Sequence, residues 1–132
     1  MTRVLIVDDH DFFRSCLVDL VNASHDLETV GECRDGSEVF DAVAALEPHV
    51  VLMDLRMPHV SGLEAAATLQ RSGSSARVIM LTTDHTARTQ REARARGAAG
   101  YLVKGANSTD VLAAVRRVAL GQTLWSDDPA AA

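Results

Sequence analysis

Lysine is almost absent from this sequence of 132 residues: twelve of its 13 basic residues are arginine, and only Lys104 is lysine. Cysteine is also scarce. Cys16 and Cys33 stand far apart and form no CxxC pair, which argues against a disulfide scaffold or a zinc knuckle; we expect two free, partly buried thiols in a reducing cytoplasm. No apolar run approaches the roughly 20 residues of a membrane span, and residues 1–3 lead directly into a strand-like segment. We therefore expect neither a membrane anchor nor a signal peptide.

Length and charge narrow the class of protein further. A chain of 132 residues is typical of one domain, and it is long enough to bury a core without disulfides or metal ions. Hydrophobic residues make up 47% of the chain and charged residues 23%, as in an ordinary globular protein. The formal net charge of −5 argues against direct binding of nucleic acid by this chain.

Four short apolar runs predict buried β-strands. They cover residues 4–7, 50–53, 78–81 and 101–103. Continuous rather than alternating apolarity is typical of strands that are buried on both faces of a parallel sheet. A weaker run at residues 27–33 is interrupted by Glu28, Gly31 and Glu32, and it predicts an edge strand.

Segments of helical length separate these runs. The predicted helices cover residues 11–22, 37–46, 61–70, 86–96 and 107–120. Ser61 and Glu64 have the S-x-x-E spacing of a capping box, and Gly97 is suited to end the fourth helix. Five alternating strand-helix units predict an α/β fold with a doubly wound parallel sheet and helices on both faces. We expect one domain over residues 1–122, followed by a tail or the start of an interdomain linker at 123–132.

Polar side chains of complementary charge follow four of the predicted strands. Asp8 and Asp9 follow the first strand, Asp54 the third, Thr82 the fourth and Lys104 the fifth. Each has a plainer interpretation when taken alone, because an aspartate or threonine after a strand often caps the next helix and a lysine is usually solvated. Together, however, they occupy the carboxyl edge of a parallel sheet, where open α/β folds bind their ligands.

This set of side chains favours phosphoryl chemistry. Three carboxylates in one crevice repel each other, so we expect a divalent cation among them, and Mg²⁺ prefers oxygen ligands. A carboxylate can also act as a nucleophile that forms an aspartyl phosphate. The Lys104 ammonium and the Thr82 hydroxyl would then stabilise the phosphoryl oxygens. A lone lysine in an arginine-rich chain suits this role because it is a compact point charge.

The strand ends lie within motifs that are similar to those of a known family. The motifs are VLIVDDH at residues 4–10, LMDLRMP at 52–58, VIMLTT at 78–83 and GYLVK at 100–104. Over residues 3–120 the chain resembles the receiver domain of two-component response regulators. The first and last motifs, with Arg14 and Leu17 after the first, look most like the NarL/FixJ class. The resemblance implies a flavodoxin-like five-stranded sheet of order 2-1-3-4-5.

The resemblance also assigns roles at the acidic end of the crevice. Asp54 would accept a phosphoryl group from a sensor histidine kinase. Mg²⁺ would be the cofactor, held by Asp8, Asp9, Asp54 and the backbone carbonyl of Arg56. The domain would not be an enzyme in the usual sense, because it would catalyse only its own phosphoryl transfer and dephosphorylation.

The resemblance also implies a phosphorylation-operated switch at the other end of the crevice. Thr82 would move to the phosphoryl group, Lys104 would pair with it, and Tyr101 would be the aromatic residue that changes rotamer with Thr82. The signal would pass to a transcriptional output, although we expect the helix-turn-helix domain typical of this class to be absent from this chain. The resemblance leaves room for a homodimer that forms on phosphorylation.

Two segments depart from the family pattern. Gly105 follows Lys104 at a position where many receivers have a proline and a cis bond. A cis peptide before a non-proline residue costs roughly 3 kcal/mol, so the resemblance does not fix the geometry of this bond. Residues 84–96 are unusually polar, and the predicted helix at 86–96 has only alanines as apolar residues. This pattern fits either a solvated helix face or a weakly anchored helix that docks only after phosphorylation.

Two further residues are expected to control the lifetime of the aspartyl phosphate. Arg56 lies two residues past Asp54, and Asp84 lies two residues past Thr82. Because both loops face the crevice, we predict that Arg56 and Asp84 pair across its mouth and hinder an attacking water.

Two other functions are consistent with parts of this pattern. A pseudo-receiver would keep the fold as a protein-interaction module without being phosphorylated, but such chains usually lack one of the site residues that are all present here. A phosphatase of the haloacid dehalogenase type also uses an aspartyl nucleophile, but it needs a second aspartate where Arg56 stands.

Overall fold

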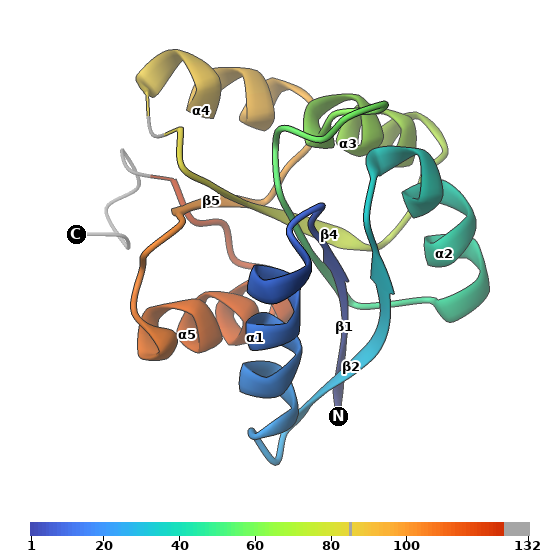
Figure 1. Cartoon of the computed structure of the whole chain (residues 1–132). Helices are drawn as coiled ribbons and strands as arrows, with labels where there is room; N and C mark the ends of the chain where they lie inside the picture. Colours follow the sequence, from blue (N-terminus) through green and yellow to red (C-terminus); the bar gives the residue numbers. More distant parts are fainter. Residues whose placement is uncertain (85, 126–132) are drawn as a thin grey trace.

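The computed structural model describes residues 1–84 and 86–125 (Figure 1). The strands are β1 (Thr2–Val7), β2 (Leu27–Cys33), β3 (Val50–Met53), β4 (Arg77–Thr82) and β5 (Gly100–Val103). The helices are α1 (Asp11–Asn22), α2 (Val39–Leu46), α3 (Gly62–Arg71), α4 (Ala87–Ala95) and α5 (Ser108–Ala119), and a short 3-10 turn, η1 (Gly36–Glu38), precedes α2. Strands and helices therefore alternate as predicted. The end of the predicted tail, residues 126–132, lies outside the described residues.

The five strands form one parallel sheet in the order β2-β1-β3-β4-β5, which confirms the predicted topology. The chain runs outward from β1 to β2 and then crosses back to β3, so the strand order reverses between β1 and β3. This reversal is where doubly wound folds open a crevice at the carboxyl edge. The register aligns Val7 at the end of β1 with Met53 at the end of β3, so the residues that follow them start level with each other.

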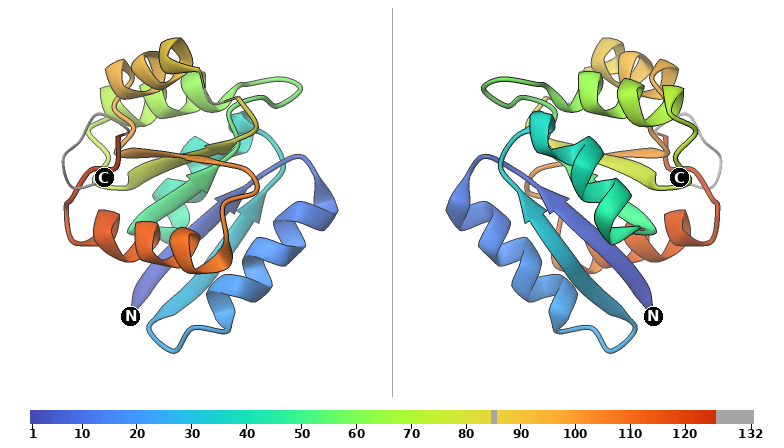
Figure 2. Two further views of the ribbon diagram at one scale, coloured as in Figure 1. Left: turned by 90° about the vertical axis from the view of Figure 1, so that its left-hand side faces the viewer. Right: turned by 90° about the vertical axis from the view of Figure 1, so that its right-hand side faces the viewer.

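The core has two layers because successive strand residues point to opposite faces of the sheet. Val4 and Ile6 of β1 belong to a cluster with the apolar residues of α1 and α5. Leu5 and Val7 belong to a second cluster, which is packed under α2, α3 and α4. Figure 2 shows the sheet between these two layers of helices.

Local capping explains where the helices begin and end. The Asp35 carboxylate accepts a hydrogen bond from Ser37 N, and the Glu38 carboxylate accepts one from Asp35 N, so this capping box opens a 3-10 turn before the helix predicted at 37–46. Gly97 follows α4 with a φ of +90°, a conformation that suits glycine. No helix in the described part of the chain is long and apolar enough to cross a bilayer.

Both cysteines are free thiols, as predicted, but only one is buried. Cys16 is exposed on α1, whereas Cys33 is buried at the end of β2. Burial, together with the nearby Glu38 charge, raises the pKa of the Cys33 thiol to about 11. The prediction of two partly buried thiols is therefore wrong in its detail.

The packed part of the described chain continues past the predicted boundary at residue 122. Leu124 forms a parallel bridge with Gly100 and bonds through its backbone to Ala99 and Tyr101. Trp125 is only 3% exposed and belongs to the cluster under α4. These two residues pack with the domain and not as part of a tail. The sequence signal was too short to reveal this, because a pairing of two residues has no periodicity.

Candidate functional site

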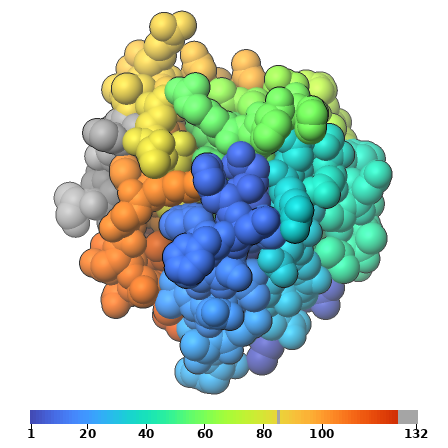
Figure 3. Space-filling view, in the orientation of Figure 1, coloured from blue at the N-terminus to red at the C-terminus, as the bar shows by residue number. Residues whose placement is uncertain are grey.

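The backbone pairing of the sheet continues one residue past the strand ends and fixes the predicted site residues. Asp54 N donates to Val7 O at 2.9 Å, and Lys104 N donates to Thr82 O at 2.8 Å. The start of α1 lies beside the segments that follow β3, β4 and β5 on one face of the molecule. In Figure 3 these are the blue, green, yellow and orange regions that adjoin near the centre.

Lys104 joins two of the three predicted carboxylates. Its ammonium nitrogen lies 2.9 Å from Asp8 Oδ2 and 3.2 Å from Asp54 Oδ2. The Lys104 side chain is 13% exposed, and Asp8 and Asp54 are almost completely buried. The structure thus brings together residues that are about 50 to 100 positions apart in the sequence, as the strand-end pattern predicts.

Burial and charge perturb both partners of the ion pair. Burial raises the pKa of the Asp54 carboxyl above its ordinary value, and the Asp8 charge adds to this effect, while Lys104 opposes it. Burial alone would lower the pKa of Lys104, but its hydrogen bonds and ion pairs with Asp8 and Asp54 outweigh burial, so the pKa is raised. Lys104 is therefore protonated at neutral pH, and its charge favours the ionised form of the neighbouring Asp54 carboxyl.

The acidic cluster has the donor set that Mg²⁺ prefers. One ligand atom from each of Asp8, Asp9, His10 and Asp54 lies within 4.8 Å of the others. Asp9 Oδ1 is buried and accepts no hydrogen bond from the described residues, and His10 Nδ1 lies 3.3 Å from it. An unpartnered buried carboxylate oxygen is costly unless a cation or water satisfies it, so the three aspartates fit a divalent cation. The backbone carbonyl of Arg56 as a further ligand stays a prediction.

Two residues that sequence reasoning did not assign support the acidic pair. His10 Nδ1 lies 3.2 Å from Asp8 Oδ1 at the exposed rim. Arg14 is buried, and its guanidinium donates to the carbonyl oxygen of Asp8 at 2.8 Å while also bonding Asp11 and Glu32. Arg14 thus fixes the backbone of the loop that carries Asp8 and Asp9. The signal was present, since Arg14 lies in the first turn of the helix that follows this loop.

Thr82 and Tyr101 are both turned toward the backbone of Asp84. Thr82 Oγ1 accepts a hydrogen bond from Asp84 N at 3.3 Å, and the Tyr101 hydroxyl donates to Asp84 O. Both side chains are buried. Burial and the Asp84 charge raise the pKa of Tyr101 to about 12, so its hydroxyl remains a donor at neutral pH. The residues predicted to switch together are therefore linked through one peptide segment.

The predicted pair across the crevice mouth is present. Arg56 Nη2 lies 2.6 Å from Asp84 Oδ2. Hydrogen bonds from Thr86 N and from Arg56 hold the pKa of Asp84 to about 2, so the carboxylate is ionised at neutral pH. The effect of this pair on phosphoryl lifetime stays a prediction.

The peptide bond between Lys104 and Gly105 is trans, as are all peptide bonds in the described ranges. Gly105 has a φ of +102°, which a residue with a side chain would rarely adopt. The chain can therefore turn after Lys104 without a proline.

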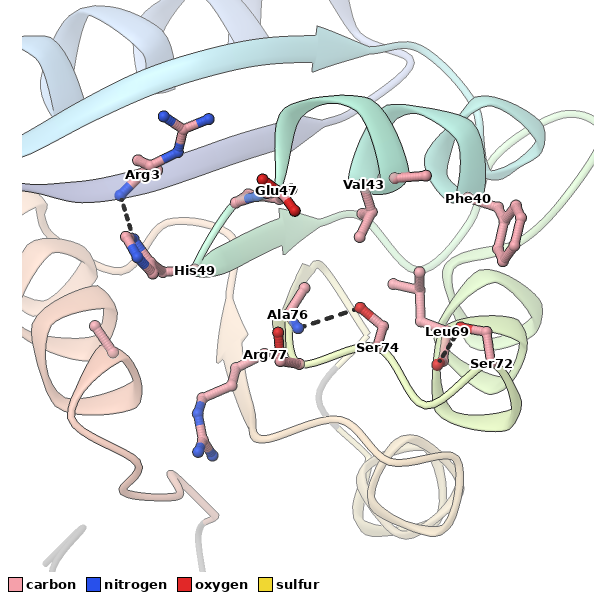
Figure 4. Close-up of a pocket in the computed structure, with 14 residues that line it drawn as sticks. Arg3, Phe40, Val43, Glu47, His49, Leu69, Ser72, Ser74, Ala76 and Arg77 are labelled. Carbon is pink, nitrogen blue, oxygen red and sulfur yellow. Dashed lines mark hydrogen bonds between the residues drawn. The ribbon is translucent and has the colours of Figure 1, made fainter.

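A hollow lies far from these residues, at the opposite edge of the sheet (Figure 4). Its volume is about 810 Å³, and among the described residues that line it only Glu47 carries a carboxylate. His49 Nδ1, on its wall, accepts a hydrogen bond from Arg3 N at 2.9 Å. Since it lacks converging carboxylates, this hollow is not the site predicted at the strand ends.

Comparison with known proteins agrees with the geometry. The family model of the response regulator receiver domain matches residues 4–116. The chain is 38% identical to response regulator GacA of Pseudomonas protegens over 122 residues, which cover 92% of this chain and 57% of that protein. It is 31% identical to the nitrate/nitrite response regulator NarL of Escherichia coli over 124 residues, again 57% of that protein. The chain therefore spans less than two thirds of the length of these relatives.

Solved structures show the same fold. The signal receiver domain of NarL from Mycobacterium tuberculosis is similar with a TM-score of 0.89 and 32% identity, over 92% of this chain and 98% of that one. A LuxR-family response regulator from Aurantimonas is similar with a TM-score of 0.90 and 27% identity, over 98% of this chain and 94% of that one.

Proposed function

Since the chain belongs to the response regulator receiver domain family, we propose that it is a phosphorylation-operated switch with Asp54 as the phosphoryl acceptor. The placement of the Asp54 carboxylate carries this proposal. Asp54 is 5% exposed, lies 3.2 Å from the Lys104 ammonium and shares the crevice with Asp8 and Asp9. The expected phosphoryl donor is a sensor histidine kinase.

In the transfer step, a carboxylate oxygen of Asp54 forms a bond to phosphorus while the bond between phosphorus and the donor nitrogen breaks. The donor nitrogen keeps the electron pair. Asp54 must be ionised to attack, and the Lys104 ammonium favours this form against the effect of burial. Lys104 then stands beside the charge that the phosphoryl oxygens bring into the crevice. The chain would thus catalyse only its own phosphorylation and dephosphorylation.

Mg²⁺ is the proposed cofactor. Asp8, Asp9, Asp54 and the backbone carbonyl of Arg56 would hold it. When bound, the cation neutralises carboxylate and phosphoryl oxygens that would otherwise repel each other. The lack of a hydrogen bond to Asp9 Oδ1 and the oxygen-rich donor set support this assignment.

The proposed switch starts at Thr82. Its hydroxyl would turn from Asp84 N to the phosphoryl group, and Tyr101 would change rotamer once the backbone of Asp84 shifts. The transcriptional output, a homodimer on phosphorylation, the cytoplasmic location and the absence of direct nucleic-acid binding by this chain are parts of the same proposal. The output and the homodimer rest on the similarity to regulators that are longer than this chain. The other two rest on the free cysteines and on the formal net charge of −5.

Incubation with acetyl phosphate and Mg²⁺, followed by intact-mass measurement, tests the proposal. We expect one phosphoryl adduct on the wild type and none on Asp54→Asn, with the exposed Asp41→Asn as the matched control. A wild type without an adduct would favour the pseudo-receiver. Rapid turnover of added phosphomonoesters would favour a phosphatase.

A further inference from the structure

Lys104 has a third neighbour besides its two carboxylates. Its ammonium nitrogen lies 4.6 Å from the centroid of the Phe13 ring. Phe13 is the third residue of α1, and it is half-buried against the apolar cluster between α1, α5 and the sheet. An ammonium within about 6 Å of an aromatic face is attracted by the ring quadrupole. None of the roles assigned above involves this side chain.

We infer that Phe13 is a positioning residue that keeps the Lys104 ammonium at the phosphoryl site, an inference that rests on the proposed function of Asp54. Asp8 and Asp54 change their charge balance when a cation binds or when Asp54 carries a phosphoryl group. The Phe13 ring is neutral, so its attraction for the ammonium persists through these changes. Lysine has a flexible stem with three rotatable donors, and it therefore gains most from a partner that stays constant.

The surroundings of Phe13 separate this role from simple packing. The ring borders a hollow of about 160 Å³ whose lining includes Leu17, Leu81 and Gly105. A leucine at position 13 would keep apolar contact with this lining but would offer no aromatic face to Lys104. A tyrosine would keep the aromatic face. The adjacent Phe12 is 83% exposed, so Phe12→Leu is the matched control.

The composition of the chain makes the contact directly observable. Lys104 is the only lysine, so selective ¹³C,¹⁵N labelling of lysine gives the NMR signals of this one side chain. We expect nuclear Overhauser contacts between the Lys104 ε-methylene and the Phe13 ring in the wild type. We also expect the ring to shift the ε-methylene signal upfield. Phe13→Leu should remove this shift, whereas Phe13→Tyr and Phe12→Leu should retain it.

The rate of phosphorylation by acetyl phosphate gives the second readout. Phe13→Leu should lower the maximal rate about two- to thirtyfold, the range expected for losing one cation–π contact, whereas Phe13→Tyr and Phe12→Leu should keep the wild-type rate. An absent ring-current shift in the wild type, or equal rates for Phe13→Leu and wild type, overturns the inference. Failure of Asp54 to be phosphorylated at all would overturn the proposed function instead. The NMR experiment would then still decide whether Phe13 contacts Lys104.

Discussion

The Arg56 guanidinium and the Asp84 carboxylate, 2.6 Å apart, connect the loop after β3 with the loop after β4. Asp84 is also bound through its backbone, because its N–H donates to Thr82 and its carbonyl oxygen accepts from Tyr101. One residue therefore connects the mouth of the crevice to both residues of the proposed switch. A movement of Thr82 toward a phosphoryl group would have to break the hydrogen bond from Asp84 N to Thr82 Oγ1.

Arg56→Ala is expected to shorten the half-life of the aspartyl phosphate. The Arg56 side chain is largely exposed, so its ion pair adds little to stability. We predict that it nevertheless hinders a water molecule that approaches the phosphoryl group. Decay of the intact-mass adduct after removal of the phosphodonor measures the half-life. Arg88→Ala, which removes an exposed arginine from α4, should leave it unchanged. An unchanged or longer half-life for Arg56→Ala would show that the pair is not a gate.

Asp35→Ala is expected to lower the free energy of unfolding by about 1–2 kcal/mol, because it removes a cap and leaves partly buried amides unpaired. The Asp35 carboxylate accepts hydrogen bonds from Ser37 N, His59 N and Val60 N, and so joins two loops beside the crevice. Urea denaturation at neutral pH measures the change. Asp41→Ala, on the exposed side of α2, is the matched control.

The stabilisation by Asp35 should depend on pH. Burial alone would raise the pKa of Asp35, but the backbone amides of His59, Ser37 and Val60 outweigh it and lower the pKa to about 2. A carboxyl whose folded pKa is lowered stabilises the fold fully above its unfolded pKa of about 3.9 and loses this contribution as pH falls toward 2. The difference in the free energy of unfolding between wild type and Asp35→Ala should therefore be constant above about pH 5 and become smaller below it. A gap that widens in acid would contradict the assignment.

Asp9→Asn should weaken Mg²⁺ binding more than Asp8→Asn does. Asp9 Oδ1 accepts no hydrogen bond in the described structure and has only His10 Nδ1, at 3.3 Å, as an ion-pair contact, whereas Asp8 already accepts from His10 N and pairs with Lys104. We expect Asp9 to be the direct ligand and Asp8 to act through water, so the loss for Asp9→Asn should be about tenfold or more. Calorimetric titration with Mg²⁺ gives both affinities. The opposite order would reverse the two roles.

Backbone amides of α4 should exchange with solvent faster than those of the other helices. Ala93 is the only buried residue of this helix, and most of the remaining side chains are polar. Weakly anchored elements are the ones available for switching, so exchange in α4 should slow when Asp54 is phosphorylated. Hydrogen exchange read by mass spectrometry tests this. Protection equal to that of α1 in both states would contradict it.

The sheet and the main site were predictable because their signals are local and repeated. Each buried strand is an uninterrupted apolar run, and parallel pairing brings the residues after these runs to one edge. The spacing of Arg56 and Asp84 relative to two site residues was also sufficient to predict that they pair.

The remaining contacts were not predictable because they depend on packing that has no sequence period. The burial of Trp125, and the position of the Arg94 guanidinium 5.4 Å from its ring centroid, follow from a two-residue pairing beside β5. They add one contact to α4, between Arg94 and Trp125, that the composition of the helix does not reveal. Likewise, the contact of Phe13 with Lys104 requires the fold that brings α1 beside the end of β5.

The most direct test of the account is chemical mapping of the phosphorylated residue. Borohydride reduces an aspartyl phosphate to homoserine, which peptide mass spectrometry locates to a single position. After treatment with acetyl phosphate and Mg²⁺, the account predicts homoserine at position 54 and at no other aspartate. Homoserine at position 8 or 9, with Asp54 unmodified, would contradict it.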